Sequence, residues 1–156
     1  MPHRIKLAFL LLLAVSAAPA TAQDREVPYW ASLRSDKVNM RVGPGEEYPI
    51  EWVYKRRGLP LKVVRLKEGW RLVEDPDGAR GWMLARFLTL DRGAYVRGKE
   101  PAEVRETAGG GGRLLWLAEP GVSGALGDCE RGWCSIDVAG KAGFVAQERL
   151  WGAGEP

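Results

Sequence analysis

The sequence predicts an all-β protein that contains two copies of one small antiparallel module. Three observations support this prediction. Within short runs, apolar residues alternate with polar residues, as they do in half-buried strands. Turn residues separate these runs, and Gly43-Pro44-Gly45 is the first such turn. Four short segments also recur in the same order along the chain, while no window after the N-terminal leader shows a sustained helical period.

The strand signals follow one another closely in the first copy. Val38 and Met40 alternate with polar neighbours, the run 61–66 is rich in aliphatic residues with two central valines, and residues 70–72 alternate again. About five short strands at this spacing indicate a small antiparallel barrel or sandwich. A single helical turn is expected at 85–88.

The internal repeat defines the domains. The matched segments are VNMR (38–41) with AEVR (102–105), EGWRLV (68–73) with RGWCSI (131–136), ARGWML (79–84) with KAGFVA (141–146), and RFL (86–88) with ERL (148–150). Each copy has roughly 55 residues, near the small end of what folds alone. We expect a first domain at 23–90 with its core at about 33–90, a connecting strand or linker at 91–99, a second domain at 100–152 and a tail at 153–156. We also expect the two modules to pack together.

The first 22 residues have the pattern of a secretory signal peptide. Arg4 and Lys6 precede the apolar run 7–15, and Ala20-Thr21-Ala22 forms a small-residue cleavage site. The apolar run is shorter than the ~18 residues that would span a bilayer. We expect cleavage after Ala22 and export of the remainder, the alternative being an N-terminal anchor that is retained.

Cleavage changes the charge and removes the only histidine. The full sequence has 23 Lys+Arg and 20 Asp+Glu, and the leader carries two of the basic residues, Arg4 and Lys6. The mature chain therefore has a net charge near +1. This balance gives no reason to expect nucleic acid as a partner. His3 also leaves, which excludes Ser-His-Asp and Cys-His catalysis and histidine-ligated metals. We therefore expect no catalytic residues, no metal and no cofactor.

The two cysteines, Cys129 and Cys134, bracket the segment ERGW. In a hairpin with a four-residue loop such positions face each other at a Cα separation of about 4.5–5.5 Å, within disulfide range. Export to an oxidising compartment favours the bond. A zinc site would need two more ligands, and a thioredoxin-type site would need C-x-x-C at the start of a helix. A structural disulfide is therefore predicted.

Several motifs together resemble a known family. The segment SLRSDKVNMRVGPGEEYPIEWVYKRRGLPLKVV, followed by GW and GARGWM, resembles the bacterial SH3 (SH3b) family, and more narrowly the exported tandem SH3-like proteins of Gram-negative bacteria. LAEPGV (117–122), the cysteine pair and LWG (150–152) fit the same group, so the resemblance covers about 30–152. It implies two tandem SH3-like small antiparallel barrels and a binding or targeting role, often towards the cell envelope or wall peptides.

The candidate ligand site lies in the first copy, because the second lacks GPG and YP. The loop 43–48 has no Lys followed by Ser or Thr and opens no helix, so it reads as a tight turn rather than a phosphate cradle. In such a turn glycine supplies φ values that other residues avoid. Aromatic faces beside guanidinium groups suit peptides, carboxylates or sugars. The candidate ligand-binding residues are Gly43, Pro44, Gly45, Tyr48, Trp52, Tyr54, Arg56 and Arg57. The alternative is a solvated basic hairpin beside core aromatics.

We therefore expect a non-catalytic, periplasmic or secreted binding module that recognises a peptide, a cell-wall fragment or an envelope protein. We expect no nucleic-acid partner and no membrane-spanning segment after cleavage. A second hypothesis is an accessory or regulatory subunit of an envelope hydrolase or transporter. An enzyme with a carboxylate or thiol active site is the third.

Overall fold

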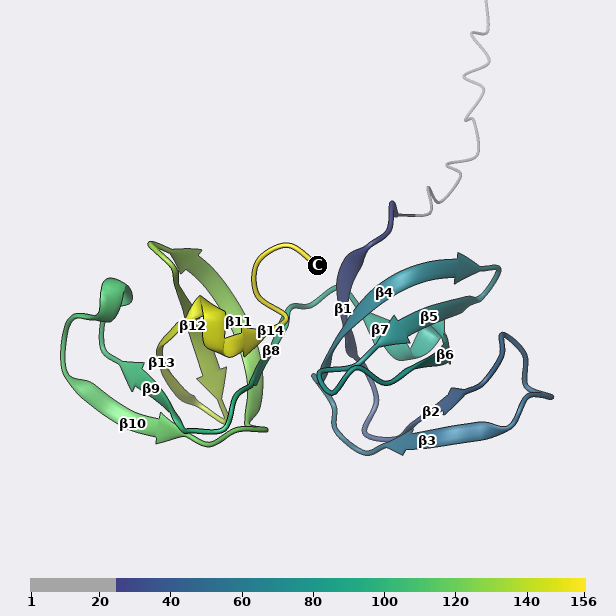
Figure 1. The fold of residues 1–156 in the computed structure, drawn as a ribbon, viewed down its shortest axis with the longest axis horizontal. Coiled ribbons are helices and arrows are strands. Elements are labelled where there is room, and N and C mark those ends of the chain that lie inside the picture. Colours follow the sequence, from purple (N-terminus) through teal and green to yellow (C-terminus); the bar gives the residue numbers. More distant parts are fainter. Residues whose placement is uncertain (1–24) are drawn as a thin grey trace, which may run out of the picture.

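The computed structural model describes residues 25–156, which form two antiparallel sheets one after the other along the chain (Figure 1). The predicted all-β fold of two tandem SH3-like barrels is confirmed. The predicted signal peptide at 1–22 lies outside the described residues. No helix within residues 25–156 has the length and hydropathy that a membrane crossing needs.

The first sheet has seven strands in the order β3-β2-β6-β5-β4-β1-β7. These are β1 (Tyr29–Leu33), β2 (Val38–Arg41), β3 (Ile50–Tyr54), β4 (Pro60–Lys67), β5 (Trp70–Glu74), β6 (Arg80–Leu84) and β7 (Leu88–Thr89). A 3₁₀ turn, η1 (Ala85–Phe87), joins β6 to β7 where the sequence predicts one helical turn.

The second sheet repeats this arrangement with the order β10-β9-β13-β12-β11-β8-β14. Its strands are β8 (Gly93–Val96), β9 (Ala102–Arg105), β10 (Leu114–Ala118), β11 (Ser123–Glu130), β12 (Trp133–Val138), β13 (Lys141–Ala146) and β14 (Leu150–Trp151), with 3₁₀ turns η2 (Ala108–Gly110) and η3 (Gln147–Arg149). Adding seven to each strand number of the first order gives the second, which confirms the tandem repeat. Strand β8, within the stretch expected to connect the domains, pairs with β11 and β14.

Each copy has seven strands rather than about five. The two-residue strands β7 and β14 are too short to show an alternation of apolar and polar residues. They form because the 3₁₀ turn before each returns the chain to the edge of the first strand, where β7 pairs with β1 and β14 with β8.

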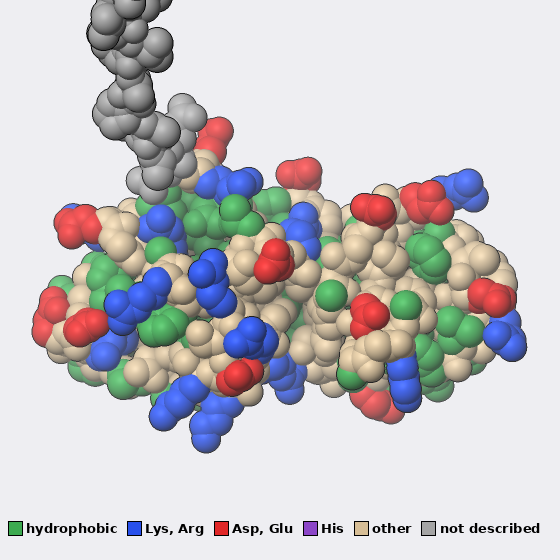
Figure 2. Space-filling model, turned by 180° about the vertical axis from the view of Figure 1, so that it is seen from behind, with side chains coloured by type: hydrophobic (Ala, Val, Ile, Leu, Met, Phe, Trp, Pro, Cys, Tyr) green, Lys and Arg blue, Asp and Glu red, His purple; other side chains and the backbone are tan. Residues whose placement is uncertain are grey.

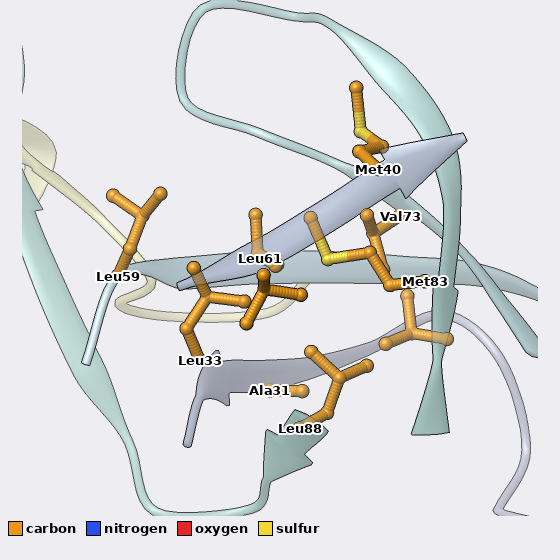
Figure 3. Packing of buried hydrophobic residues seen from close by; sticks show 10 residues of the cluster. Ala31, Leu33, Met40, Leu59, Leu61, Val73, Met83 and Leu88 are labelled. Carbon is orange, nitrogen blue, oxygen red and sulfur yellow. The ribbon is translucent and has the colours of Figure 1, made fainter. Parts of the chain in front are cut away.

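The core of the first module follows from strand alternation. Side chains two apart share a face of a strand, so Val38 and Met40 both point inward and are 1% and 0% exposed. Figure 3 shows how residues from β1, β2, β4, β5, β6, β7 and the β3–β4 loop meet in this core. Its buried members are Ala31, Leu33, Val38, Met40, Leu59, Leu61, Val63, Val73, Met83 and Leu88.

The predicted disulfide between Cys129 and Cys134 is confirmed. The two residues are directly paired across β11 and β12, with their Cα atoms 3.9 Å apart. Cys134 is fully buried in the core of the second module, whereas Cys129 is exposed. The bond therefore ties the tip of this hairpin to the core beneath it.

The two modules contact each other through aromatic side chains. Trp151 of β14 lies against Trp30 of β1 with ring centroids 5.0 Å apart and an interplanar angle of 77°. Each indole also donates across the boundary, Trp30 Nε1 to Gly154 O at 2.9 Å and Trp151 Nε1 to Pro60 O at 3.2 Å. An edge-to-face ring pair with both N–H groups satisfied is favourable packing, so the two barrels are joined by specific contacts.

Candidate functional site

The eight candidate ligand-binding residues do not form one cluster. Gly43, Pro44, Gly45 and Tyr48 form the tip of the β2–β3 hairpin, and Trp52 and Tyr54 lie further along β3. A strand advances about 3.3 Å per residue, so Tyr48 and Tyr54 are separated by roughly 20 Å along the chain. The hairpin tip and the far end of β3 are therefore separate surfaces.

The hairpin tip is a closed turn. Gly45 N donates to Gly43 O at 3.0 Å, Tyr48 N donates to Gly45 O at 3.3 Å, and Arg41 Nη1 donates to Tyr48 O at 2.6 Å. Two of the loop's amides thus bond within the loop, unlike the convergent free amides of a phosphate cradle. Gly43 and Gly45 do not have positive φ angles, so the expectation that they supply φ values avoided by other residues is wrong. Gly43 is required by close packing, because a Cβ there would lie 2.3 Å from Tyr48 Cδ1.

An open pocket of about 520 Å³ lies at the other end of β3. We call it the aromatic pocket. Its lining includes Trp52, Tyr54, Lys55, Arg56, Asp75, Asp77 and Tyr95. These residues come from β3, the β3–β4 loop, the β5–β6 turn and β8. The pocket thus brings together three aromatic side chains and charges of both signs.

Asp75 fixes the wall of the aromatic pocket. The residue is 7% exposed, and its Oδ1 accepts hydrogen bonds from Asp77 N at 3.0 Å and Ala79 N at 2.8 Å. Its Oδ2 accepts from the Tyr54 hydroxyl at 2.7 Å. A buried carboxylate needs such partners, and here they hold the β5–β6 turn against β3. The segment Asp75–Gly78 is thus a turn whose first side chain orders it.

The Tyr54 phenol is correspondingly hard to ionise. Burial, and then the hydrogen bond and negative charge of Asp75, raise the pKa of Tyr54 well above its usual value of 10.0. The hydroxyl stays protonated and continues to donate to Asp75 through the neutral and mildly alkaline range. The ring is therefore held in a fixed orientation on the wall of the pocket.

The second module completes the aromatic pocket. Tyr95 belongs to β8 of that module and packs against the core of the first. Beside it, Arg56 Nη1 donates to Gly121 O of the second module at 2.6 Å. The pocket consequently depends on how the two barrels are packed.

Sequence reasoning missed Asp75, Asp77 and Tyr95. The two aspartates belong to the sequence Asp-Pro-Asp-Gly, a turn signal between strands, and Tyr95 lay in the expected connecting segment. Asp75 is followed by the turn signal Pro-Asp-Gly, but its burial depends on contacts with a strand some twenty residues earlier. Tyr95 meets the first module only through tertiary packing, so no local pattern identifies it.

The second module does not repeat the aromatic pocket. Strand register matches Val38–Tyr54 with Ala102–Ala118, so alanine stands where the first module has Tyr54. Trp52 does have a counterpart, Trp116, because each pairs with the equivalent position of the preceding strand. The combination of Trp52, Tyr54 and the hydrogen bond from Tyr54 to a buried aspartate is therefore specific to the first copy, although Asp137 accepts a hydrogen bond from Gly140 N in the equivalent turn.

Arg57 does not line the aromatic pocket. It lines an open cleft of about 350 Å³ between the modules, together with Arg34, Asp91 and Asp137. Its guanidinium lies 3.5 Å from Asp36 in an exposed ion pair. The neighbours Arg56 and Arg57 thus line two different hollows, the aromatic pocket and the cleft between the modules.

Comparison with known proteins finds one domain family twice along the chain. The family model described as "Bacterial SH3 domain" matches twice, over residues 34–88 and 98–152. No curated protein matches the chain in sequence.

Among solved structures, NlpC2 and NlpC1 from Trichomonas vaginalis each align with 10% identity and a TM-score of 0.37. The alignments cover 82% and 89% of this chain but 49% and 50% of the other two chains, respectively. The chain therefore spans about half the length of these two proteins.

Proposed function

Because the chain belongs to the bacterial SH3 domain family, whose domains are binding modules, we propose that it is a non-catalytic exported protein that binds peptides. The ligand would be a peptide, including the peptide part of a cell-wall fragment or a segment of an envelope protein. The signal-peptide pattern of residues 1–22 supports a periplasmic or secreted location.

One observation carries the proposal: Trp52, Tyr54 and Tyr95 gather around a single open pocket, and the second module has alanine at the position equivalent to Tyr54. Pockets of roughly 300–1,000 Å³ with aromatic walls and a few fixed polar groups are typical of ligand sites. Trp52 is 56% exposed although it is a large apolar side chain, so its ring face is available for contact.

The charges around the aromatic pocket suit a ligand with both amino and carboxylate groups. Asp77 supplies a carboxylate on one side, and Lys55 and Arg56 supply cations on the other. Peptides and the peptide stems of cell-wall fragments carry both groups. In addition, β3 ends its sheet, so its outer edge can pair with an extended peptide backbone.

The test is a titration of the protein with purified muropeptides, followed by amide chemical shifts. We expect shifts at residues 52–56, 75–79 and 95, and loss of binding in Trp52→Ala and Tyr95→Ala. Trp116→Ala is the matched control, since it removes the equivalent indole from the second module. Shifts confined to 43–48 would move the site to the hairpin tip, and no shift in either region would refute the proposal.

A further inference from the structure

The two modules carry opposite net charge. Residues 25–90 contain 13 Lys+Arg and 9 Asp+Glu, whereas residues 91–156 contain 8 and 10. The first module is therefore near +4 and the second near −2, although the whole is almost neutral. Figure 2 shows Lys and Arg side chains more numerous over the first module, on the left in that view, and gathered along its lower edge.

Much of this positive charge lies on two adjacent loops. We call Arg34, Lys37, Lys55, Arg56 and Arg57 the basic rim; all five are exposed. The β1–β2 and β3–β4 loops that carry them are bonded together, Leu33 N to Leu59 O at 3.0 Å and Gly58 N to Leu33 O at 2.8 Å. Figure 1 shows both loops at the same end of the first barrel.

Within the described residues the basic rim has a single ion pair, although Asp91 and Asp137 line the same cleft as Arg34 and Arg57. Asp36 pairs with Arg57, and it is the one acidic residue of these two loops. Arg34, Lys37 and Lys55 have no ion pair or side-chain hydrogen bond to any residue in 25–156. Like charges this close repel one another in the folded state, so the cluster favours an external anion.

The second module shows that the fold does not need these charges. Its equivalent loops, 97–101 and 119–122, read RGKEP and EPGV. They contain two basic and two acidic residues, against five basic and one acidic in the first module, and nevertheless connect the corresponding strands. The basic rim is thus an addition to the first copy.

We infer that the basic rim docks the protein on an anionic phospholipid surface. Four to eight clustered Lys and Arg residues are a typical footprint for such membranes. Trp52 and Val53, 56% and 44% exposed, lie beside Lys55 and Arg56 on the same pocket edge. Tryptophan next to basic residues suits the headgroup region, whereas a soluble polyanion would leave these apolar side chains in water.

The docking orients the aromatic pocket relative to the membrane, but it does not depend on what that pocket binds. The pocket shares only Lys55 and Arg56 with the basic rim. Vesicle binding in the absence of any peptide tests the rim alone, so its failure would leave the peptide proposal standing.

The experiment is cosedimentation of the chain from residue 23 onward with vesicles of phosphatidylglycerol and phosphatidylcholine, compared with phosphatidylcholine alone. We expect binding only to the anionic vesicles. Because each basic residue strengthens such binding roughly fivefold, Arg34→Gln/Lys37→Gln/Lys55→Gln should weaken it by about 100-fold. These three side chains have no partner to lose, and circular dichroism checks that the variant is folded.

The matched control is Lys99→Gln/Arg131→Gln/Lys141→Gln, which removes the same charge from exposed positions of the second module. It should bind nearly as well as the wild type. Raising the salt from about 0.1 M to about 1 M shortens the Debye length from about 10 Å to about 3 Å and should release the unmodified protein. Equal loss in both triple variants, no binding to anionic vesicles, or binding to soluble tripolyphosphate alone would each overturn the inference.

Discussion

Replacing Trp151 with threonine should weaken the packing of the two barrels. Threonine is the natural choice because Thr89 holds the equivalent position at the end of β7. The change removes the edge-to-face contact with Trp30, the hydrogen bond to Pro60 O, and the approach of Lys62 Nζ to within 5.2 Å of the indole. Each is worth about 1 kcal/mol, so we expect a loss of about 2–3 kcal/mol.

Calorimetry and hydrogen exchange measure this loss. The unfolding midpoint should fall by roughly 5–10 °C, and amides of both modules, such as Val63 and Val145, should exchange faster. Trp133→Thr is the control, because Trp133 lies at the tip of the β11–β12 hairpin and contacts Gly110 within its own module. That variant should speed exchange in the second module only. If Trp151→Thr leaves the exchange of the first module unchanged, the aromatic contact does not couple the barrels.

Three further predictions concern individual modules. Removing the disulfide with Cys129→Ala/Cys134→Ala should lower the free energy of unfolding in urea by about 2 kcal/mol, because the closed loop is short. A native protein whose intact mass exceeds that of the disulfide-bonded form by two hydrogens would show that the bond does not form. Gly81→Ala places a Cβ 2.5 Å from Met40 Cγ and 2.9 Å from Arg41 O, so it should destabilise the first module by about 1–3 kcal/mol. In the control Gly69→Ala the new Cβ meets no atom within 4 Å, and the change should be nearly neutral. Similar unfolding midpoints for the two variants would contradict the packing argument. Because the pKa of Tyr54 is raised in the folded state, that state keeps a proton which the unfolded chain releases near pH 10. The stabilisation of the fold by this proton is therefore fully present below about pH 10 and is lost as the pH rises above it. Unfolding titrations from pH 8 to 11 should therefore show a steeper loss for the wild type than for Tyr54→Phe, and parallel curves would exclude the effect.

Local pattern was sufficient to predict most of the framework. The repeat at an almost constant offset, the alternation at Val38 and Met40, and the turn residues between the runs depend only on neighbours in the chain. The pairing of Cys129 with Cys134 is similarly local, because the four residues between them fix the register of one hairpin. For the same reason η1 was expected at nearly its observed residues.

The candidate site was less accessible to such reasoning. The hairpin tip and the far end of β3 were grouped because they are neighbours in sequence, yet an extended strand holds them apart. Conversely, Tyr54 and Asp75 meet because β5 and β3 belong to one folded barrel, and their hydrogen bond spans 21 positions of the chain. Tyr95 reaches the same pocket from the other module, through a contact that no repeat or turn signal encodes.

The sequence by itself determined two β modules, their order, the disulfide and the first copy as the one that differs. These features follow from short-range periodicity, turn chemistry and the comparison of one copy with the other. Only the tertiary structure decided that Arg56 and Arg57 line two different hollows, that Arg34 and Lys37 join Lys55 on one rim, and that the aromatic pocket is shared between the barrels. The physical reason is that each of these contacts depends on how strands pair around a barrel and on how two barrels pack, and both are set by the burial of distant side chains.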